Sequence, residues 1–204
     1  TRKDGQYLRW DSRAGRILKS NFNKGLIWNF KSALTAKLNL MLGDIKKRHG
    51  KAPDQNVEIL EGSCLVELPK IPANTFDLVI TSPPYANRYD YTRTYALELA
   101  FMGCDDKAVK NLRQALLSCT VENKSKRKLL AEEYAARHEQ NFYHYAVNAF
   151  GKQEVLQEVL NALQQAKANR ALNNNNIPNL VENYFFEMNL VIHELARVLK
   201  PGGK

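Results

Sequence analysis

Glycine-rich turns are missing from this chain. Its 10 glycines form no Gly-x-Gly, and the one adjacent pair, Gly202-Gly203, lies at the very end. A dinucleotide-like cofactor site needs such a turn, because the backbone must approach the ligand closely there. The chain also starts at Thr1 rather than Met. We therefore expect a piece of a longer protein, with any glycine-rich loop before residue 1 or after residue 204.

Cysteine and histidine are scarce. Cys64, Cys104 and Cys119 are odd in number and lack disulfide or metal spacing. This pattern predicts reduced thiols in a cytoplasmic protein. The four histidines have no partners at zinc-ligand spacing, so we expect no metal site.

Long apolar runs are absent as well. No stretch approaches the length that spans a bilayer, so we expect no membrane partner. Hydrophobic residues make up 44% of the 204 residues and charged residues 25%. This composition is typical of one globular domain that buries a real core.

The most informative segment present is Thr81-Ser82-Pro83-Pro84-Tyr85, which follows an apolar run at 76–80. Leu78-Val79-Ile80 is typical of a short strand that is buried on both faces of a parallel sheet. Two prolines then end the strand, because neither can donate to a strand ladder. The loop should therefore leave the carboxyl edge of the sheet, where open α/β sheets bind their ligands.

This loop suits the attack of a weakly nucleophilic amine. The exocyclic NH2 of a nucleobase has its lone pair delocalised into the ring, so acceptors that hold its hydrogens favour attack. The Ser82 hydroxyl and the Pro83 carbonyl can supply those acceptors, and the Tyr85 ring can stack on a base taken out of its duplex. An ordinary strand-to-loop turn is the alternative. A polyproline ligand is a poor one, because a buried strand directly precedes the loop.

Residues 57–103 resemble the catalytic segment of the DNA amino-methyltransferases. The likeness includes Glu61-Gly62-Ser63, the leucines that follow it, and the run from Asp77 to Tyr85. It resumes at 199–204, which resembles the turn before the next sheet strand in AdoMet-dependent methyltransferases. The resemblance implies an α/β, Rossmann-like AdoMet-dependent methyltransferase fold with a partial sheet, in which 54–103 and 177–204 form parts of the catalytic core.

The same resemblance implies the site residues. The resemblance implies that the catalytic residues are Ser82, Pro83, Pro84 and Tyr85. S-adenosyl-L-methionine (AdoMet) would lie near Glu61, Ser63, Thr81 and Ser82, although Ser63 stands where the family usually has an acid.

The resemblance also bears on the reaction. A serine in first place of the motif favours cytosine N4 as the target, with a role in restriction-modification. Adenine N6 or an RNA base remains the nearer alternative, and a non-catalytic DNA-binding fragment without the cofactor half is the more distant one. Enzymes that methylate carbon 5 of cytosine use a cysteine thiolate, set in that family's Pro-Cys dipeptide, as a covalent nucleophile. No Pro-Cys occurs in this chain, so that reaction is excluded.

Positive charge is concentrated in residues 1–51, which carry 13 Lys or Arg against three Asp. We assign 1–53 to a basic segment that contains a hairpin and a helix at 25–48. The helix's apolar stripe (Leu26, Ile27, Phe30, Leu34, Leu38, Met41 and Ile45) is predicted to be core. Concentrated charge beside a base-modifying motif favours a surface that tracks DNA phosphates over a merely solvated face.

Residues 94–170 are predicted to be mostly helical. We interpret 104–176 as a helical insertion, which in the family selects the target sequence. Candidate DNA contacts are Arg88, Arg93, Lys126, Arg127 and Lys128, with the tyrosines of 89–95 available for base stacking. A final helix that begins near Pro178 should bury one stripe against the sheet, namely Tyr184, Met188, Val191, Leu195 and Val198.

Overall fold

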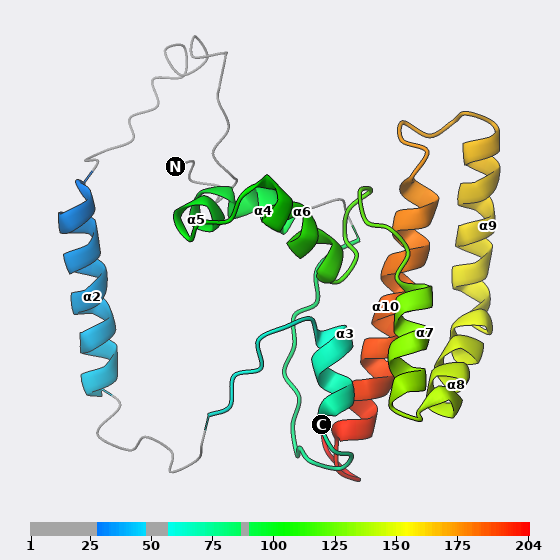
Figure 1. Cartoon of the computed structure of the whole chain (residues 1–204), viewed down its shortest axis with the longest axis horizontal. Coiled ribbons are helices and arrows are strands. Elements are labelled where there is room, and N and C mark those ends of the chain that lie inside the picture. Colours follow the sequence, from blue (N-terminus) through cyan, green and yellow to red (C-terminus); the bar gives the residue numbers. More distant parts are fainter. Residues whose placement is uncertain (1–27, 48–56, 87–89) are drawn as a thin grey trace. The chain divides into compact units, whose positions relative to one another are not determined.

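The computed structural model describes residues 28–47, 57–86 and 90–204, and the chain divides into two compact units. One unit, Arg9–Ile59, contains helix α2 (Phe30–Lys47), which confirms the predicted helix within the described part (Figure 1). The predicted hairpin lies outside the described residues. The apolar stripe of α2 is not core: no residue of the helix is buried, and Ile45 is 66% exposed. A stripe becomes core only when another apolar face covers it, and the described residues of this unit supply no such face.

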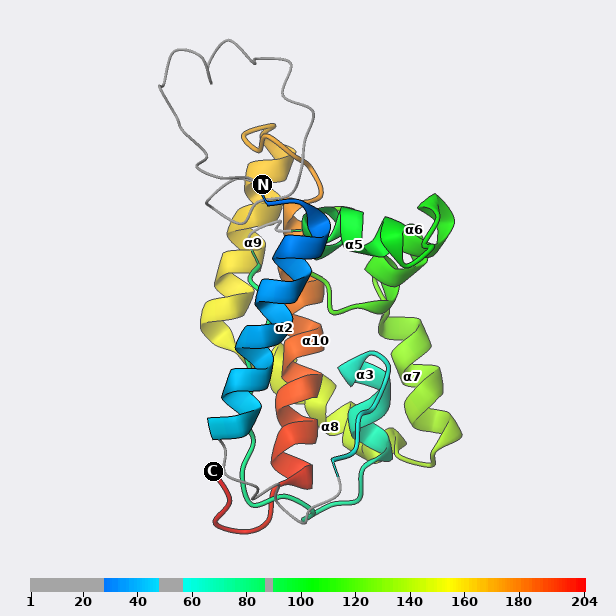
Figure 2. The same ribbon diagram turned by 90° about the vertical axis from the view of Figure 1, so that its left-hand side faces the viewer.

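The other unit is organised around a long helix, α10 (Ile177–Val198). Figures 1 and 2 show α8 and α9 running alongside it. Its partners are α8 (Gln140–Gly151), α9 (Glu154–Ala168), α3 (Cys64–Glu67) and the 3-10 turn η1 (Leu68–Lys70), while α7 (Arg127–Ala136) packs on α8. We call α7 to α10 the helical body. Residues 104–176, the predicted insertion, are mostly helical, as expected.

Aromatic and aliphatic side chains fill the core between these helices. Phe150 and Phe186 meet edge to face with ring centroids 5.5 Å apart, and Tyr134 lies 5.4 Å from Tyr143. Such pairs add to the burial of apolar area. The buried cluster consists of Leu65, Leu117, Leu130, Tyr134, Tyr143, Ala146, Phe150, Phe186, Leu190 and Val191. Leu65 of α3 thereby ties the predicted catalytic core to the insertion.

The buried stripe of α10 differs from the predicted one. Of the predicted residues, Val191 and Val198 are buried, and the other three are half-buried. The most buried positions recur every three or four residues and include polar side chains: Leu180, Asn183, Glu187, Leu190, Glu194 and Val198. Apolar spacing alone missed this face, because its glutamates are buried together with their partners.

Glu187 and Glu194 illustrate such partners. Lys126 Nζ lies 2.8 Å from Glu187 Oε1, and Ser118 donates to Glu187 through both its backbone N–H and its hydroxyl. The Tyr134 hydroxyl donates to Glu194 at 2.7 Å. Burial is the main cause that raises the pKa of Tyr134, and the hydrogen bond to Glu194 adds to it. These contacts fix α10 to segments far away in the sequence.

The strand predicted at 78–80 is not formed, and the described residues at 57–61 also form no strand. One parallel bridge joins Phe76 to Leu199, with Phe76 N–H donating to Val198 O and Lys200 N–H donating to Phe76 O. Leu78 and Ile80 are 56% and 87% exposed, so the prediction that they are buried on both faces is wrong for this chain. A strand in the middle of a sheet has a neighbour on each side, and the described residues supply only this single bridge.

Glycine allows the close approach at this bridge. A Cβ at Gly203 would lie 2.9 Å from Lys200 O and 3.2 Å from Asp77 O. Because glycine has no Cβ, the two segments approach closely. The Lys204 N–H donates to Asp77 O, and the Lys204 carbonyl accepts from Val79 N–H. Segments 76–79 and 199–204 therefore begin a parallel pairing, and α10 lies on the crossover between them.

Three short helices complete this unit, namely α4 (Tyr91–Thr94), α5 (Ala96–Phe101) and α6 (Asp106–Ala115). The Asp90 and Asp105 side chains cap α4 and α6 by accepting backbone N–H groups. None of the described helices has the length and apolar character needed to cross a membrane.

Candidate active site

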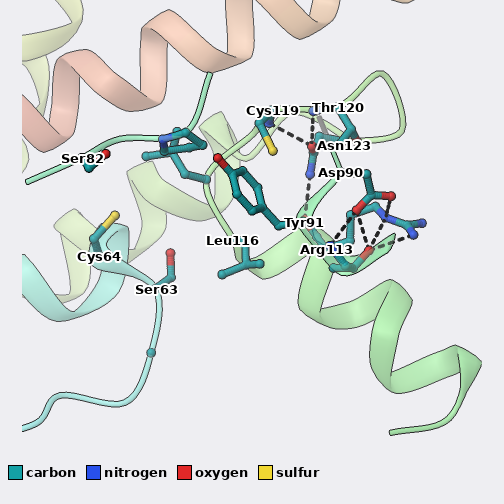
Figure 3. A pocket seen from close by; sticks show the side chains of 14 residues that line it. Ser63, Cys64, Ser82, Asp90, Tyr91, Arg113, Leu116, Cys119, Thr120 and Asn123 are labelled. Atoms are coloured by element: carbon teal, nitrogen blue, oxygen red, sulfur yellow. Dashed lines mark hydrogen bonds and ion pairs between the residues drawn. The ribbon is translucent and has the colours of Figure 1, made fainter. Parts of the chain in front are cut away.

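A cavity of about 420 Å³ lies where the proline loop meets the start of the insertion (Figure 3). Its volume falls within the range of small-ligand sites. Three parts of the chain line it: residues 62–64 before α3, Ser82 and Pro84 of the proline loop, and the region from α4 to the loop after α6. That last region contributes Asp90, Tyr91, Thr92, Arg113, Leu116, Leu117, Cys119, Thr120 and Asn123.

Ser63 presents an unused polar group to this cavity. It is the N-cap residue of α3, but its side chain makes no capping bond, and its buried Oγ has no partner. In Figure 3 the hydroxyl points toward the side on which Ser82 and Tyr91 lie. A buried hydroxyl without a partner costs free energy, so this position favours a polar ligand.

The proline loop is held by the final helix. The Tyr184 hydroxyl of α10 donates to the Pro84 carbonyl at 2.7 Å. Burial raises the pKa of Tyr184, so the phenol keeps its proton and remains a donor. No described residue donates to the Pro83 carbonyl, which leaves that acceptor available.

An Asp-Thr-Arg cluster forms another wall of the cavity. Asp90 is buried; its Oδ1 accepts from the Thr92 backbone and hydroxyl, and its Oδ2 lies 3.0 Å from Arg113 Nε. Arg113 also donates to the Thr92 hydroxyl from Nε and Nη2. The cluster joins α4 to α6, and fixes Tyr91 between two tethered neighbours.

Tyr91 lies across the cavity. Figure 3 shows its ring between Leu116 and the loop that carries Ser82. Tyr85, the predicted stacking ring, is 68% exposed and does not line the cavity. Tyr91 is therefore the better placed aromatic wall.

The far wall is a loop organised by Asn123. Its Oδ1 accepts from Cys119 N–H and from both the backbone and the hydroxyl of Thr120, and its Nδ2 donates to Arg113 O. Burial raises the pKa of the Cys119 thiol, with Asp90 adding to the effect, so the thiol stays protonated. A protonated thiol is a weak nucleophile, and this wall shapes the cavity.

The predicted cofactor residues are only partly brought together. Ser63 and Ser82 line the same cavity, whereas Glu61 and Thr81 are exposed and do not. Asp90, Thr92, Arg113 and Asn123 were not predicted as site residues. An Asp two residues before a Thr is a recognisable cap signal for the first two; the sequence carries no signal for Arg113 or Asn123.

The predicted DNA contacts have different surroundings. Lys126 is only 9% exposed and its charge is used by Glu187, so it does not fit the predicted role as a phosphate ligand. Arg127 lies 4.0 Å over the Phe186 ring and pairs with Glu182, and Arg93 pairs with Asp90 and Glu122. The Lys128 side chain is 92% exposed, and its Nζ lies 3.9 Å from Glu132 Oε1. Arg88 lies outside the described residues.

Metal chemistry has no support within the described part of the chain. No cluster of three or more His, Cys, Asp or Glu side chains there has a geometry that could hold a metal ion.

Comparison with known proteins bears on the whole length of the chain. It is 44% identical, over 220 aligned positions, to the Type II methyltransferase M.BsoBI of Geobacillus stearothermophilus, and 43% identical over 209 positions to the Type II methyltransferase M.AvaI of Nostoc sp. and of Anabaena variabilis. Over nearly its whole length the chain is similar to a part of these Type II methyltransferases. The alignments cover 99–100% of the chain but only 41–43% of each relative, so the chain spans less than half of their length. No family model and no solved structure matches it.

Proposed function

We propose that the protein containing this chain transfers a methyl group from AdoMet to an exocyclic amine of a DNA base, with cytosine N4 as the target and restriction-modification in the cytoplasm as its role. One observation carries the proposal: Ser82 and Pro84 of the proline loop line the same cavity as the unpartnered Ser63 hydroxyl. The relationship to Type II methyltransferases supports it.

The chain's own groups suit an amine substrate. A base that leaves its duplex can place its NH2 between the Ser82 hydroxyl and the Pro83 carbonyl, which accept its hydrogens and direct the lone pair outward. The Tyr91 ring offers a face for stacking, which offsets part of the cost of unstacking the base. Tyr184 keeps the loop in place through Pro84.

The residues present fit one side of an AdoMet site. Ser63, with its buried unpartnered hydroxyl, and Ser82 are the groups that would hold the cofactor here. When bound, AdoMet supplies an electrophilic methyl group. A glycine-rich loop is absent from the 204 residues, and we assign it to the part of the protein that corresponds to the remaining length of the relatives.

A Rossmann-like sheet and a DNA surface belong to the same proposal. The parallel bridge between Phe76 and Leu199, with α10 on the crossover, supports the sheet arrangement expected of a methyltransferase core. For the backbone of DNA we retain Arg88, Arg93 and Lys128 as contacts, together with the basic segment 1–53. Arg127 is a weaker candidate, because its guanidinium already contacts Phe186 and Glu182.

Substitution in the full-length protein tests the proposal. In Ser82→Ala, we expect the single-turnover rate of labelled methyl transfer to duplex DNA to fall about a hundredfold, since one group that positions the amine is lost. The affinity for AdoMet should change much less. Gln164→Ala, at an exposed position of α9, serves as the control. If Ser82→Ala and Tyr85→Ala both left the rate intact, the assignment of the site to the proline loop would be wrong.

A further inference from the structure

A second hollow lies beside the active-site cavity. This polar cleft has a volume of about 770 Å³, and Asn123 lines both it and the active-site cavity. The loop at 120–125 thus separates the two. The other groups that line the cleft are Val121, Glu122, Lys124, Ser125, Arg127, Asn174, Asn176, Asn179, Glu182 and Asn183.

The charges and amides of the polar cleft are unequally engaged. Glu122 pairs with Arg93 at 2.8 Å and Glu182 pairs with Arg127 at 2.9 Å, so both carboxylates are neutralised. The exposed side chains of Lys124, Asn176 and Asn179 make no hydrogen bond or ion pair with a described residue. The unengaged groups that are also exposed are therefore the Lys124 cation and the amides of Asn176 and Asn179; each amide can both donate and accept.

These groups stand on a fixed frame. The Gln114 amide donates to Glu122 O and accepts Lys124 N–H, which holds the loop against α6. Asn176 is the N-cap residue of α10, where its backbone N–H donates to Asn174 Oδ1 and its side chain makes no capping bond; Asn179 follows three residues later, so the two lie on one side of the helix start. Side chains on a fixed frame can select a ligand by geometry.

We infer that the polar cleft reads the edges of the base pairs that flank the target base in duplex DNA. The inference rests on the proposed function. An Asn amide can bond the N6 and N7 of adenine, and a Lys can bond the O6 and N7 of guanine. Because Asn123 is shared, a duplex whose target base enters the active-site cavity places the neighbouring pairs near the cleft. Lys124, Asn176 and Asn179 are then specificity-determining residues.

Selectivity, rather than activity, is the readout of the test. Full-length protein is given duplex oligonucleotides in which each base pair that flanks the methylated base is changed in turn, and kcat/KM is measured on each. For Asn179→Ala, we expect the preference for the cognate pair to fall roughly tenfold at one or two flanking positions. Asn179→Asp should shift the preference at the same positions toward a cytosine amine. Lys152→Ala, exposed at the end of α8, should leave every ratio unchanged.

The outcomes separate the two claims. If wild-type protein transfers no methyl group to DNA, the proposed function fails and the inference fails with it. If wild type methylates one sequence selectively and the Asn176, Asn179 and Lys124 variants keep its ratios, only the inference is overturned. An equal loss on all sequences would also overturn it, because such a loss is typical of phosphate contact without base reading. Circular dichroism of each variant confirms that the fold is retained.

Discussion

The helical body and the catalytic segment at 57–86 use apolar residues in opposite ways. In the helical body, Leu130, Phe186 and Leu190 are each only 1% exposed. In the catalytic segment, Ile59 and Ile80 are 85% and 87% exposed. Both stretches are rich in apolar residues, so the difference lies in whether the described residues include partners that cover them.

The difference follows from where each kind of element finds its backbone hydrogen-bond partners. Helices make their backbone hydrogen bonds within one segment, so the helical body needs only side-chain partners, which it finds in α7 to α10. A parallel strand needs backbone partners from distant segments, and one such bridge is present. The proline loop is nevertheless held, because Tyr184 of the helical body bonds Pro84. The helical body thus holds the proline loop through α10.

The largest effect is expected for the buried ion pair of the helical body. Glu187→Ala leaves the Lys126 ammonium and the Ser118 N–H without their acceptor. We expect the free energy of unfolding to fall by about 3–5 kcal/mol, measured by denaturant titration. Glu182→Ala, on the same helix but in a partly exposed pair with Arg127, should cost less than about 1 kcal/mol. Equal costs would break the contrast between buried and solvated pairs.

Truncation of one apolar residue in each region tests the comparison directly. In the 204-residue chain, Leu190→Ala should lower the free energy of unfolding by about 2–5 kcal/mol, whereas Ile80→Ala should change it by less than about 0.5 kcal/mol. In the full-length protein, whose sheet we propose to cover Ile80, that cost should rise to roughly 2 kcal/mol. If it stays small there, the catalytic segment does not form a buried strand.

A smaller effect is expected at high pH. The Tyr134 pKa is raised by burial and by Glu194, while the unfolded chain ionises this phenol near pH 10. The raised pKa therefore stabilises the fold below about pH 10, and this contribution is lost as the pH rises further. Between pH 9 and 11, Tyr134→Phe should lose about 1.4 kcal/mol less stability than wild type. The control Tyr145→Phe, at an exposed position of α8, should lose as much stability over this pH range as wild type. If Tyr134→Phe also lost as much as wild type, Tyr134 would not be the source of the pH dependence.

The last prediction concerns the hydrogen bond that links the two regions. Tyr184→Phe removes the hydrogen bond to Pro84 O and should cost about 1 kcal/mol. Its effect on the methyl-transfer rate should be larger than that cost implies, because the proline loop loses its anchor. Denaturant titration and single-turnover kinetics on the same protein measure both. Unchanged kinetics would show that the helical body does not position the loop.

Local patterns predicted the helices and the proline loop, because capping, periodicity and proline geometry act over a few residues. The pattern at 76–81 predicted a buried strand, but burial there depends on neighbouring strands that the described residues do not provide. Lys126 was predicted to face DNA, since nothing near it in the sequence points to Glu187, 61 residues away.

The sequence predicted some of the residues that line the candidate site and missed others. Ser82 and Ser63 follow from the motif, and the structure brings both to one cavity. Arg113 and Asn123 reach it only through packing between α4, α6 and the following loop, which no local spacing encodes.

The identity of the methylated nucleoside tests the central claim most directly. Duplex DNA is incubated with the full-length protein and AdoMet, digested to nucleosides and analysed by mass spectrometry. The account predicts N4-methylcytosine. N6-methyladenine alone would defeat the cytosine assignment while keeping an exocyclic amine as the acceptor. Finding 5-methylcytosine, or no methylated nucleoside, would contradict the claim that the Ser82 loop orients an amine for methylation.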